Sequence, residues 1–260
     1  MTLVSHQAQF IFLKTHKTAS TSVEAALEPL CAPDGVETGA HVHDELITPE
    51  GIIGARGRFS KTATWKNHMS ARKVRRLVGR GAFRRYEKIT TMRNPYARMV
   101  SMFHSRMSPS DRAEIADLPF DDVRRRFGRW LGEARPSNNL NKLTIRHRYV
   151  IDRVVYFERL AEDFGALAAH FGLPTAELPR FKSDRNLRPE RWIDYYDEDT
   201  RALVERGSAF ELAYFGYRFA AGSAGGPNPP SRRRLFGGLA RSDPARALAA
   251  FRIHRGISAT

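Results

Sequence analysis

The sequence is poor in cysteine and in long apolar runs. Its single cysteine, Cys31, excludes a disulfide within the chain and a zinc site built from several cysteines. No stretch of 18 apolar residues predicts a membrane-spanning helix, and the first residues do not have the pattern of a secretory leader. We therefore expect a cytoplasmic protein, because a reducing compartment is the simplest one for such a chain.

Acidic residues are also scarce. The chain has 28 Asp and Glu against 43 Lys and Arg, which gives a formal net charge of +15. This imbalance favours anionic partners: nucleotides, sulfated or phosphorylated small molecules, nucleic acid or anionic lipid surfaces. The charge alone does not choose among them.

The order of apolar and polar segments predicts one α/β domain over residues 1–219. Strands are expected at 10–13, at 86–92 and within 150–160. Helices are expected to begin near Val23 and Pro95, and to cover 160–173 and 197–209. This alternation is typical of a central, mostly parallel sheet flanked by helices.

Residues 220–260 form a tail of different composition, rich in glycine, proline and arginine. Residues 221–260 carry seven Arg and one Asp, a net +6. We expect this tail to be flexible. The alternative is a short basic amphipathic helix within "PARALAAFRIHRG" that touches a membrane surface peripherally.

Glycine is missing where it would be most informative. "FIFLKTHKTASTSVEAAL" (10–27) has the strand, polar loop and helix of a phosphate-binding loop, yet it lacks the G-x-x-x-x-G-K-[ST] pattern of nucleotide triphosphatases. Unpaired N–H groups and the dipole at a helix start still favour an anion there. The candidate anion-binding residues are Lys17, Thr18, Ala19, Ser20, Thr21 and Ser22. The alternative is that the Ser and Thr side chains only cap the helix.

A second candidate segment, "MRNPYARMVSMF", places Arg93 at the end of a predicted strand. If a helix starts at Pro95, Ser101 lies in its second turn. Arg93 and Ser101 could then hold one phosphate from two sides, with the guanidinium as a bidentate donor. Alternatively, both are ordinary surface residues. Arg98, on the same helix, is a candidate for an ion pair instead.

Together, the two segments resemble the two phosphosulfate-binding motifs of sulfotransferases that use 3′-phosphoadenosine-5′-phosphosulfate (PAPS). "FLKTHKTAS" is similar to the loop of galactose 3-O-sulfotransferases, and "KTASTS" to that of heparan sulfate 2-O-sulfotransferase. The similarity extends to the Golgi-type carbohydrate enzymes and their bacterial relatives over about residues 9–219. Two motifs in this order and spacing are specific, whereas either alone is not.

The resemblance implies a P-loop-like three-layer fold and transfer of a sulfuryl group from PAPS to a hydroxyl. It assigns the 5′-phosphosulfate to residues 17–22, with Lys17 as a catalytic charge, and the 3′-phosphate to Arg93 and Ser101. The product is then 3′-phosphoadenosine-5′-phosphate (PAP), and no metal is required. The acceptor is expected to be a glycan or glycolipid, with no nucleic-acid partner. One departure is His16, which stands where the family often has proline.

A general base is expected between the two motifs, where the family has a His or Glu. His68 lies there, in a loop before a predicted helix that Ser70 could cap, and we expect its pKa near the ordinary ~6.5. His16 is the second candidate. The H-x-H of His41 and His43 beside Asp44 hints at a metal, but no further ligands follow at a recognisable spacing.

Two other functions remain open from the residues. A P-loop kinase-like phosphotransferase is disfavoured by the missing G-K-[ST] and by the lack of an acidic strand end for magnesium. A non-catalytic module that binds polyanions or nucleotides is supported mainly by the net charge. Preference for PAP over ATP, or salt-sensitive binding to any polyanion, would distinguish them.

Overall fold

The computed structural model describes residues 2–39, 42–134, 136, 138–146, 148–174, 177–179 and 188–226. The described chain forms two compact units. The first contains the described parts of 1–92 and 139–181, and the second contains those of 93–138 and 182–227. The strands and helices, in chain order, are β1 (Leu3–Ser5), β2 (Phe10–Phe12), α1 (Ser20–Leu27), β3 (Leu46–Ile47), β4 (Gly51–Ile53), α2 (Ala71–Val78), α3 (Arg80–Arg85), β5 (Glu87–Met92), α4 (Pro95–Arg106), α5 (Pro109–Asp117), α6 (Phe120–Ala134), α7 (Leu140–Leu143), β6 (Thr144–Ile145), β7 (Arg148–Tyr149), β8 (Arg153–Tyr156), α8 (Leu160–Phe171), α9 (Glu198–Gly207) and α10 (Ala209–Phe215).

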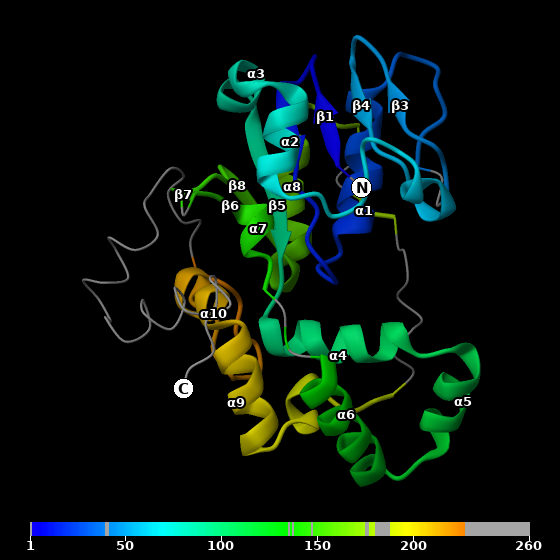
Figure 1. The fold of residues 1–260 in the computed structure, drawn as a ribbon, viewed down its shortest axis with the longest axis vertical. Coiled ribbons are helices and arrows are strands. Elements are labelled where there is room, and N and C mark those ends of the chain that lie inside the picture. Colours follow the sequence, from blue (N-terminus) through cyan, green and yellow to red (C-terminus); the bar gives the residue numbers. More distant parts are fainter. Residues whose placement is uncertain are drawn as a thin grey trace. The chain divides into compact units, whose positions relative to one another are not determined.

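The first unit is built on a six-stranded sheet with the order β3-β4-β1-β2-β5-β8 (Figure 1). β2 pairs with β5 and β5 with β8 in parallel, while β1, β3 and β4 pair antiparallel. The α/β class is therefore confirmed, and the sheet is mixed. Its parallel part holds the three strands that the sequence predicts. A P-loop-like fold stays a prediction.

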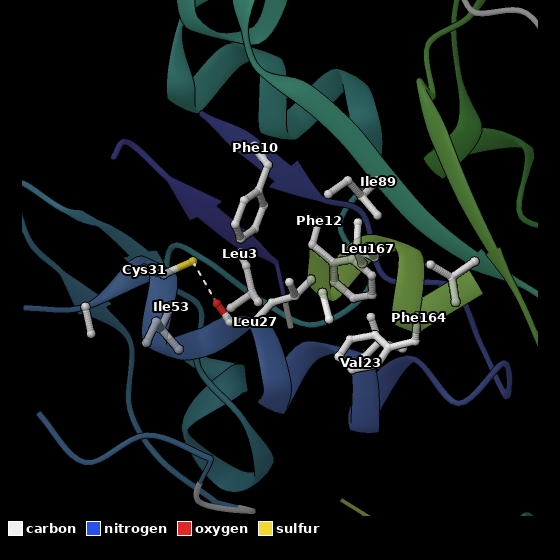
Figure 2. Close-up of a cluster of buried hydrophobic side chains, with 13 residues drawn as sticks. Leu3, Phe10, Phe12, Val23, Leu27, Cys31, Ile53, Ile89, Phe164 and Leu167 are labelled. Atoms are coloured by element: carbon white, nitrogen blue, oxygen red, sulfur yellow. Dashed lines mark hydrogen bonds between the residues drawn. The ribbon is translucent and has the colours of Figure 1, made fainter. Parts of the chain in front are cut away.

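One face of this sheet is covered by α1 and α8. Phe12 and Ile89 on the sheet, Val23 on α1 and Phe164 on α8 belong to one cluster of fully buried side chains (Figure 2). Neighbouring strand residues point to opposite faces. On the other face the Lys88 ammonium accordingly lies 5.8 Å from the ring centroid of Phe83 in α3. α3 therefore contacts the opposite face of the sheet at the start of β5.

The second unit is helical. Its core joins α4, α6 and α9 through buried aromatic and aliphatic residues, among them Tyr96, Phe103, Phe127 and Val204. α4 begins where the sequence predicts, with Pro95 in its first turn and the Asn94 side chain accepting a hydrogen bond from Tyr96 N at 3.1 Å.

Most predicted boundaries are close to the observed ones. The strands at 86–92 and 150–160 correspond to β5 and β8, and the helix at 160–173 corresponds to α8, which ends at left-handed Gly172. α1 starts at Ser20, three residues before the predicted Val23. In the described part of the chain, no helix is both long and apolar enough to cross a membrane.

The start of the predicted tail is hydrogen-bonded to the second unit. Ser223 Oγ accepts from Arg218 N at 2.9 Å, and Gly226 N donates to Phe215 O at 2.7 Å. The remainder of the tail, with its predicted helix, lies outside the described residues. The domain boundary at residue 219 stays a prediction. Truncations before and after these two hydrogen-bonded residues would test it.

A chain that ends after Gly226 should unfold within about 2 °C of the full chain, because surface changes usually alter stability by less than ~0.5 kcal/mol. A chain that ends after Phe219 loses both contacts and should unfold at a lower temperature. Thermal unfolding of the three proteins checks this. A large fall for the Gly226 truncation would show that the remaining tail packs on the protein.

Candidate functional site

The first candidate element is the β2–α1 loop, residues 13–19. The helix that follows has Ala19 as its N-cap, in a left-handed conformation, and no side chain caps it. The structure therefore contradicts the alternative that the Ser and Thr side chains merely cap this helix. Because Ser22 N and Val23 N both donate to Ala19 O, the amides of Ser20 and Thr21 precede the first intrahelical bond.

The loop achieves without glycine a backbone shape that glycine usually supplies. Lys17 and Ala19 both have φ of 58°, and Thr18 between them lies outside the positive-φ region. Alternation of this kind turns successive N–H groups toward one concavity, which is an anion-binding arrangement. A non-glycine residue in this region costs roughly 1–2 kcal/mol, so neighbouring contacts must stabilise the loop.

Those contacts are hydroxyl hydrogen bonds that join the loop to β5. Thr15 Oγ1 donates to Thr91 O at 2.5 Å, and Thr18 Oγ1 lies 2.8 Å from Thr15 Oγ1 and 2.6 Å from Thr91 Oγ1. Ser20 Oγ donates to Thr15 O at 2.9 Å. We therefore assign the hydroxyls of Thr18 and Ser20 to holding the loop, while their amides stay candidates for the anion.

A cluster of buried charged side chains fixes both ends of the β2–α1 loop. The Glu24 carboxylate, on α1, accepts from Lys14 Nζ at 2.6 Å and from Arg56 Nη2 at 3.1 Å; Arg56 also contacts Glu28 at 2.5 Å. All four residues are at most 6% exposed. Lys14 Nζ further donates to Thr21 Oγ1 at 3.2 Å.

The cluster sets the pKa values of its two carboxyl groups in opposite directions. Burial raises the pKa of Glu24, but nearby positive charges, among them Lys14 and Arg56, outweigh it and lower the pKa. For Glu28 burial prevails over Arg56, and the pKa is raised. Glu24 is therefore the charged centre of the cluster.

The two candidate bases are in contact. The rings of His16 and His68 stack with centroids 3.6 Å apart and an interplanar angle of 23°. His68 Nδ1 lies 3.3 Å from Lys14 O, to which it can only donate, so the neutral ring carries its lone pair on Nε2. His68 also has a positive φ of 54°. The predicted cap is confirmed: Ser70 accepts from Lys73 N.

The expectation of an ordinary pKa for His68 is wrong. Burial, followed by the adjacent His16 and the charge on Lys14, lowers the pKa of His68 to about 2. An imidazole taken out of water beside positive groups cannot hold a second proton at neutral pH. In the free protein His68 is consequently neutral but weakly basic.

The 3′-phosphate candidates lie in the second unit. Arg93, half-buried, comes directly before the N-cap of α4, and Ser101, also half-buried, lies in the second turn. Arg98 is the predicted ion-pair residue: its Nη2 lies 2.7 Å from Glu211 Oε2, and both side chains are at most 1% exposed. Arg98 therefore serves the fold of this unit.

The residues that position the loop, Lys14, Thr15, Glu24 and Thr91, are not among those that the sequence motifs predict. The only local signal was the polar end of each strand. Among the described residues, no group of three or more His, Cys, Asp or Glu could hold a metal ion. Of the H-x-H pair, His41 lies outside the described residues, and His43 Nδ1 donates to Asp44 O at 2.6 Å.

A parallel strand, a glycine-free loop with alternating backbone and a short helix define an α/β protein whose β2–α1 loop is a candidate anion-binding element. A model described as the sulfotransferase family matches residues 1–201. The chain therefore belongs to the sulfotransferase family, whose reaction is sulfuryl transfer. No curated protein and no solved structure matched the chain.

The Glu24→Gln variant should be less stable by about 3 kcal/mol at pH 7, because Lys14 and Arg56 remain buried without their charged partner. Folding lowers the pKa of Glu24 from its ordinary 4.5. The contribution of ionised Glu24 to the free energy of unfolding is therefore complete above pH 4.5. It is lost as the pH falls through the lower pKa that Glu24 has in the folded protein. Denaturant unfolding from pH 7 to pH 3 checks both statements.

The matched control is Glu87→Gln. Glu87 pairs with Arg153 at 2.7 Å, but both side chains are partly exposed, at 23% and 31%. Such a pair is worth about 1 kcal/mol or less. Equal destabilisation by the two variants would contradict the central role of Glu24.

Proposed function

We propose that this protein transfers the sulfuryl group of PAPS to a hydroxyl of a carbohydrate or glycolipid. The observation that carries the proposal is the β2–α1 loop, in which Lys17 and Ala19 adopt left-handed conformations under a hydroxyl network. Its residues belong to a segment that the sulfotransferase family matches. A bisphosphorylated donor has no γ-phosphate, so it does not need the long glycine-rich loop that surrounds the phosphates in a nucleotide triphosphatase.

In this proposal the loop holds the sulfuryl end of the donor. The amides of residues 17–21 and the hydroxyls of Thr21 and Ser22 bind the 5′-phosphosulfate, and Lys17 adds a charge that can follow the bridging oxygen. Arg93 and Ser101 are the proposed contacts of the 3′-phosphate.

The reaction needs one group that takes the proton of the attacking hydroxyl and one that stabilises the negative charge on the leaving oxygen. The acceptor hydroxyl attacks sulfur, its proton passes to His68 Nε2, and the bond between sulfur and the bridging oxygen breaks to release PAP. Lys17 stabilises the negative charge that develops on this oxygen. The charges of the bound donor oppose those of Lys14 and His16, so donor binding should raise the low pKa of His68.

The donor assignment predicts a strong preference for PAP over AMP, which lacks the 3′-phosphate. Loss of a charge-assisted contact costs roughly 1.5–3 kcal/mol, about ten- to hundredfold in affinity. Arg93→Ala should remove most of this preference, whereas Arg106→Ala, at the exposed far end of α4, should keep it. Calorimetry with PAP, AMP and Mg·ATP checks this. Equal affinity for PAP and AMP, or preference for Mg·ATP, would overturn the assignment.

The base assignment predicts that His68→Ala lowers turnover by roughly 10²–10⁴ at saturating PAPS and leaves PAP affinity unchanged. Lys17→Ala should weaken both, because the lysine contacts the donor before and during reaction. Since the pKa of His68 in the free protein is about 2, the acid limb of kcat/KM for PAPS should lie well below pH 6.5.

The control for this assignment is His16→Ala, which removes the stacked neighbour. If His16→Ala abolishes turnover and His68→Ala does not, the base is in the loop itself. An acid limb at pH 6.5 that disappears in His68→Gln would contradict the lowered pKa.

A further inference from the structure

Charges of opposite sign are segregated along the first unit. Residues 18–55 contain seven Asp or Glu and no Lys or Arg, whereas residues 57–86 contain ten Lys or Arg and no Asp or Glu. The buried cluster uses two of the acidic residues, Glu24 and Glu28, as partners of Lys14 and Arg56. Most of the other charged residues of the two segments are exposed.

The acidic segment supplies one edge of the six-stranded sheet. Asp34, Glu37 and Asp44 are exposed. No Lys or Arg in the described part of the chain forms a salt bridge with them. Ile47 lies in β3, the strand at the edge of the sheet, and is 58% exposed. We define the acidic edge as Asp34, Val36, Glu37, Val42, Asp44 and Ile47.

The buried cluster holds this edge in place. Gly39 N donates to Glu28 Oε2 at 2.6 Å, which fixes the stretch that contains residues 34–37. Arg56 N donates to His43 O at 2.9 Å, and the Arg56 guanidinium contacts Glu28 Oε1 at 2.5 Å. Both stretches of the acidic edge are therefore anchored to one buried carboxylate. A surface that is already ordered loses less conformational freedom when a partner binds.

The basic segment forms a second surface on α2 and α3. Its arginines are exposed, and no carboxylate among the described residues forms a salt bridge with them. On α6, by contrast, the exposed Arg125 pairs with Asp122. Burial, followed by the charges of Arg80, Arg146 and Arg72, lowers the pKa of Arg75, which shows how closely like charges are placed here. We define the basic surface as Arg72, Arg76, Leu77, Arg80 and Arg85.

Exposed apolar side chains gather on the same two surfaces. In the described part of the chain, the large apolar side chains that are exposed are Val36, Val42, Ile47 and Leu77. The first three belong to the acidic edge, and Leu77 belongs to the basic surface. Apolar side chains surrounded by charged ones are typical of protein–protein interfaces. The opposite charges make the two surfaces complementary to each other.

We propose that this protein forms a two-fold symmetric dimer in which the acidic edge of each copy contacts the basic surface of the other. The inference does not depend on the proposed sulfuryl transfer. Both surfaces belong to one unit, and β3 and α3 lie on opposite sides of β1 (Figure 1). A two-fold axis between them forms both contacts at once and leaves neither surface for a third copy.

The dimensions of the unit suit one interface. α3 contacts β5 through Phe83 and Lys88, and β5 is four strands away from β3 in the sheet. At ~4.8 Å per strand, the two surfaces are about 19 Å apart. A standard interface buries about 800 Å² of each partner, which corresponds to a patch roughly 30 Å across. Both contacts therefore fit within one interface of ordinary size.

The test uses two charge-reversed variants and a matched control. The acidic-edge variant carries Asp34→Lys, Glu37→Lys and Asp44→Lys, and the basic-surface variant carries Arg72→Glu, Arg76→Glu and Arg80→Glu. The control carries Arg124→Glu, Arg125→Glu and Arg129→Glu on the exposed side of α6, with the same change of charge as the basic-surface variant. Sedimentation velocity gives the mass of each protein, and of an equimolar mixture of the two reversed variants, at low and at high salt.

The wild type and the α6 control should sediment as dimers at low salt and dissociate as the salt concentration rises. Each reversed variant alone should have a dimer dissociation constant higher by roughly a hundredfold or more, because like charges then face each other. The mixture should form a dimer again, because one variant presents two basic surfaces and the other two acidic ones. This recovery also shows that both variants are folded.

Four results would overturn the inference: a monomeric wild type, a dimer that persists in either reversed variant alone, assemblies that grow beyond two copies, or a mixture of folded variants that stays monomeric. Thermal unfolding shows whether each variant is folded. If a triple variant does not fold, the single substitutions Glu37→Lys and Arg76→Glu provide the same mixing test.

Discussion

The buried contact between the Glu24 carboxylate and the Lys14 ammonium governs the candidate site. It ties the end of β2 to the second turn of α1, and Arg56 joins a third segment to the same carboxylate. A buried charge is tolerated only when its partners are close and well placed. Because α1 is fixed in this way, the amides at its start have one direction, and the loop between β2 and α1 has one path.

The second constraint is the cost of a glycine-free loop. Lys17 and Ala19 each adopt a backbone conformation that costs roughly 1–2 kcal/mol for a residue with a side chain. The five hydrogen bonds among Thr15, Thr18, Ser20 and Thr91 contribute about 0.5–1.5 kcal/mol each, which is enough to offset this cost. The loop is therefore preorganised by β5, the strand that leads to Arg93.

Local features were predictable because their causes are local. The apolar residues of β2, the proline at the start of α4, the cap at Ser70 and the glycine after α8 each determine structure within a few residues. The ion cluster and the threonine contacts were not predictable, since Thr15 and Thr91 are 76 residues apart in sequence. The low pKa of His68 likewise arises from burial and from His16, which no local pattern shows. The two motifs did predict the family, because they preserve residue types and order.

The most direct test of this account is to follow the backbone amide signals of the isotope-labelled protein by NMR as PAP is added. We expect saturable shifts concentrated in residues 17–22, with the largest at Ser20 and Thr21, whose amides precede the first intrahelical bond of α1. The same loop shifts should weaken in Glu24→Gln, because the helix start is no longer held. Saturable shifts that spare residues 17–22 would contradict the central claim that this loop is the anion-binding element.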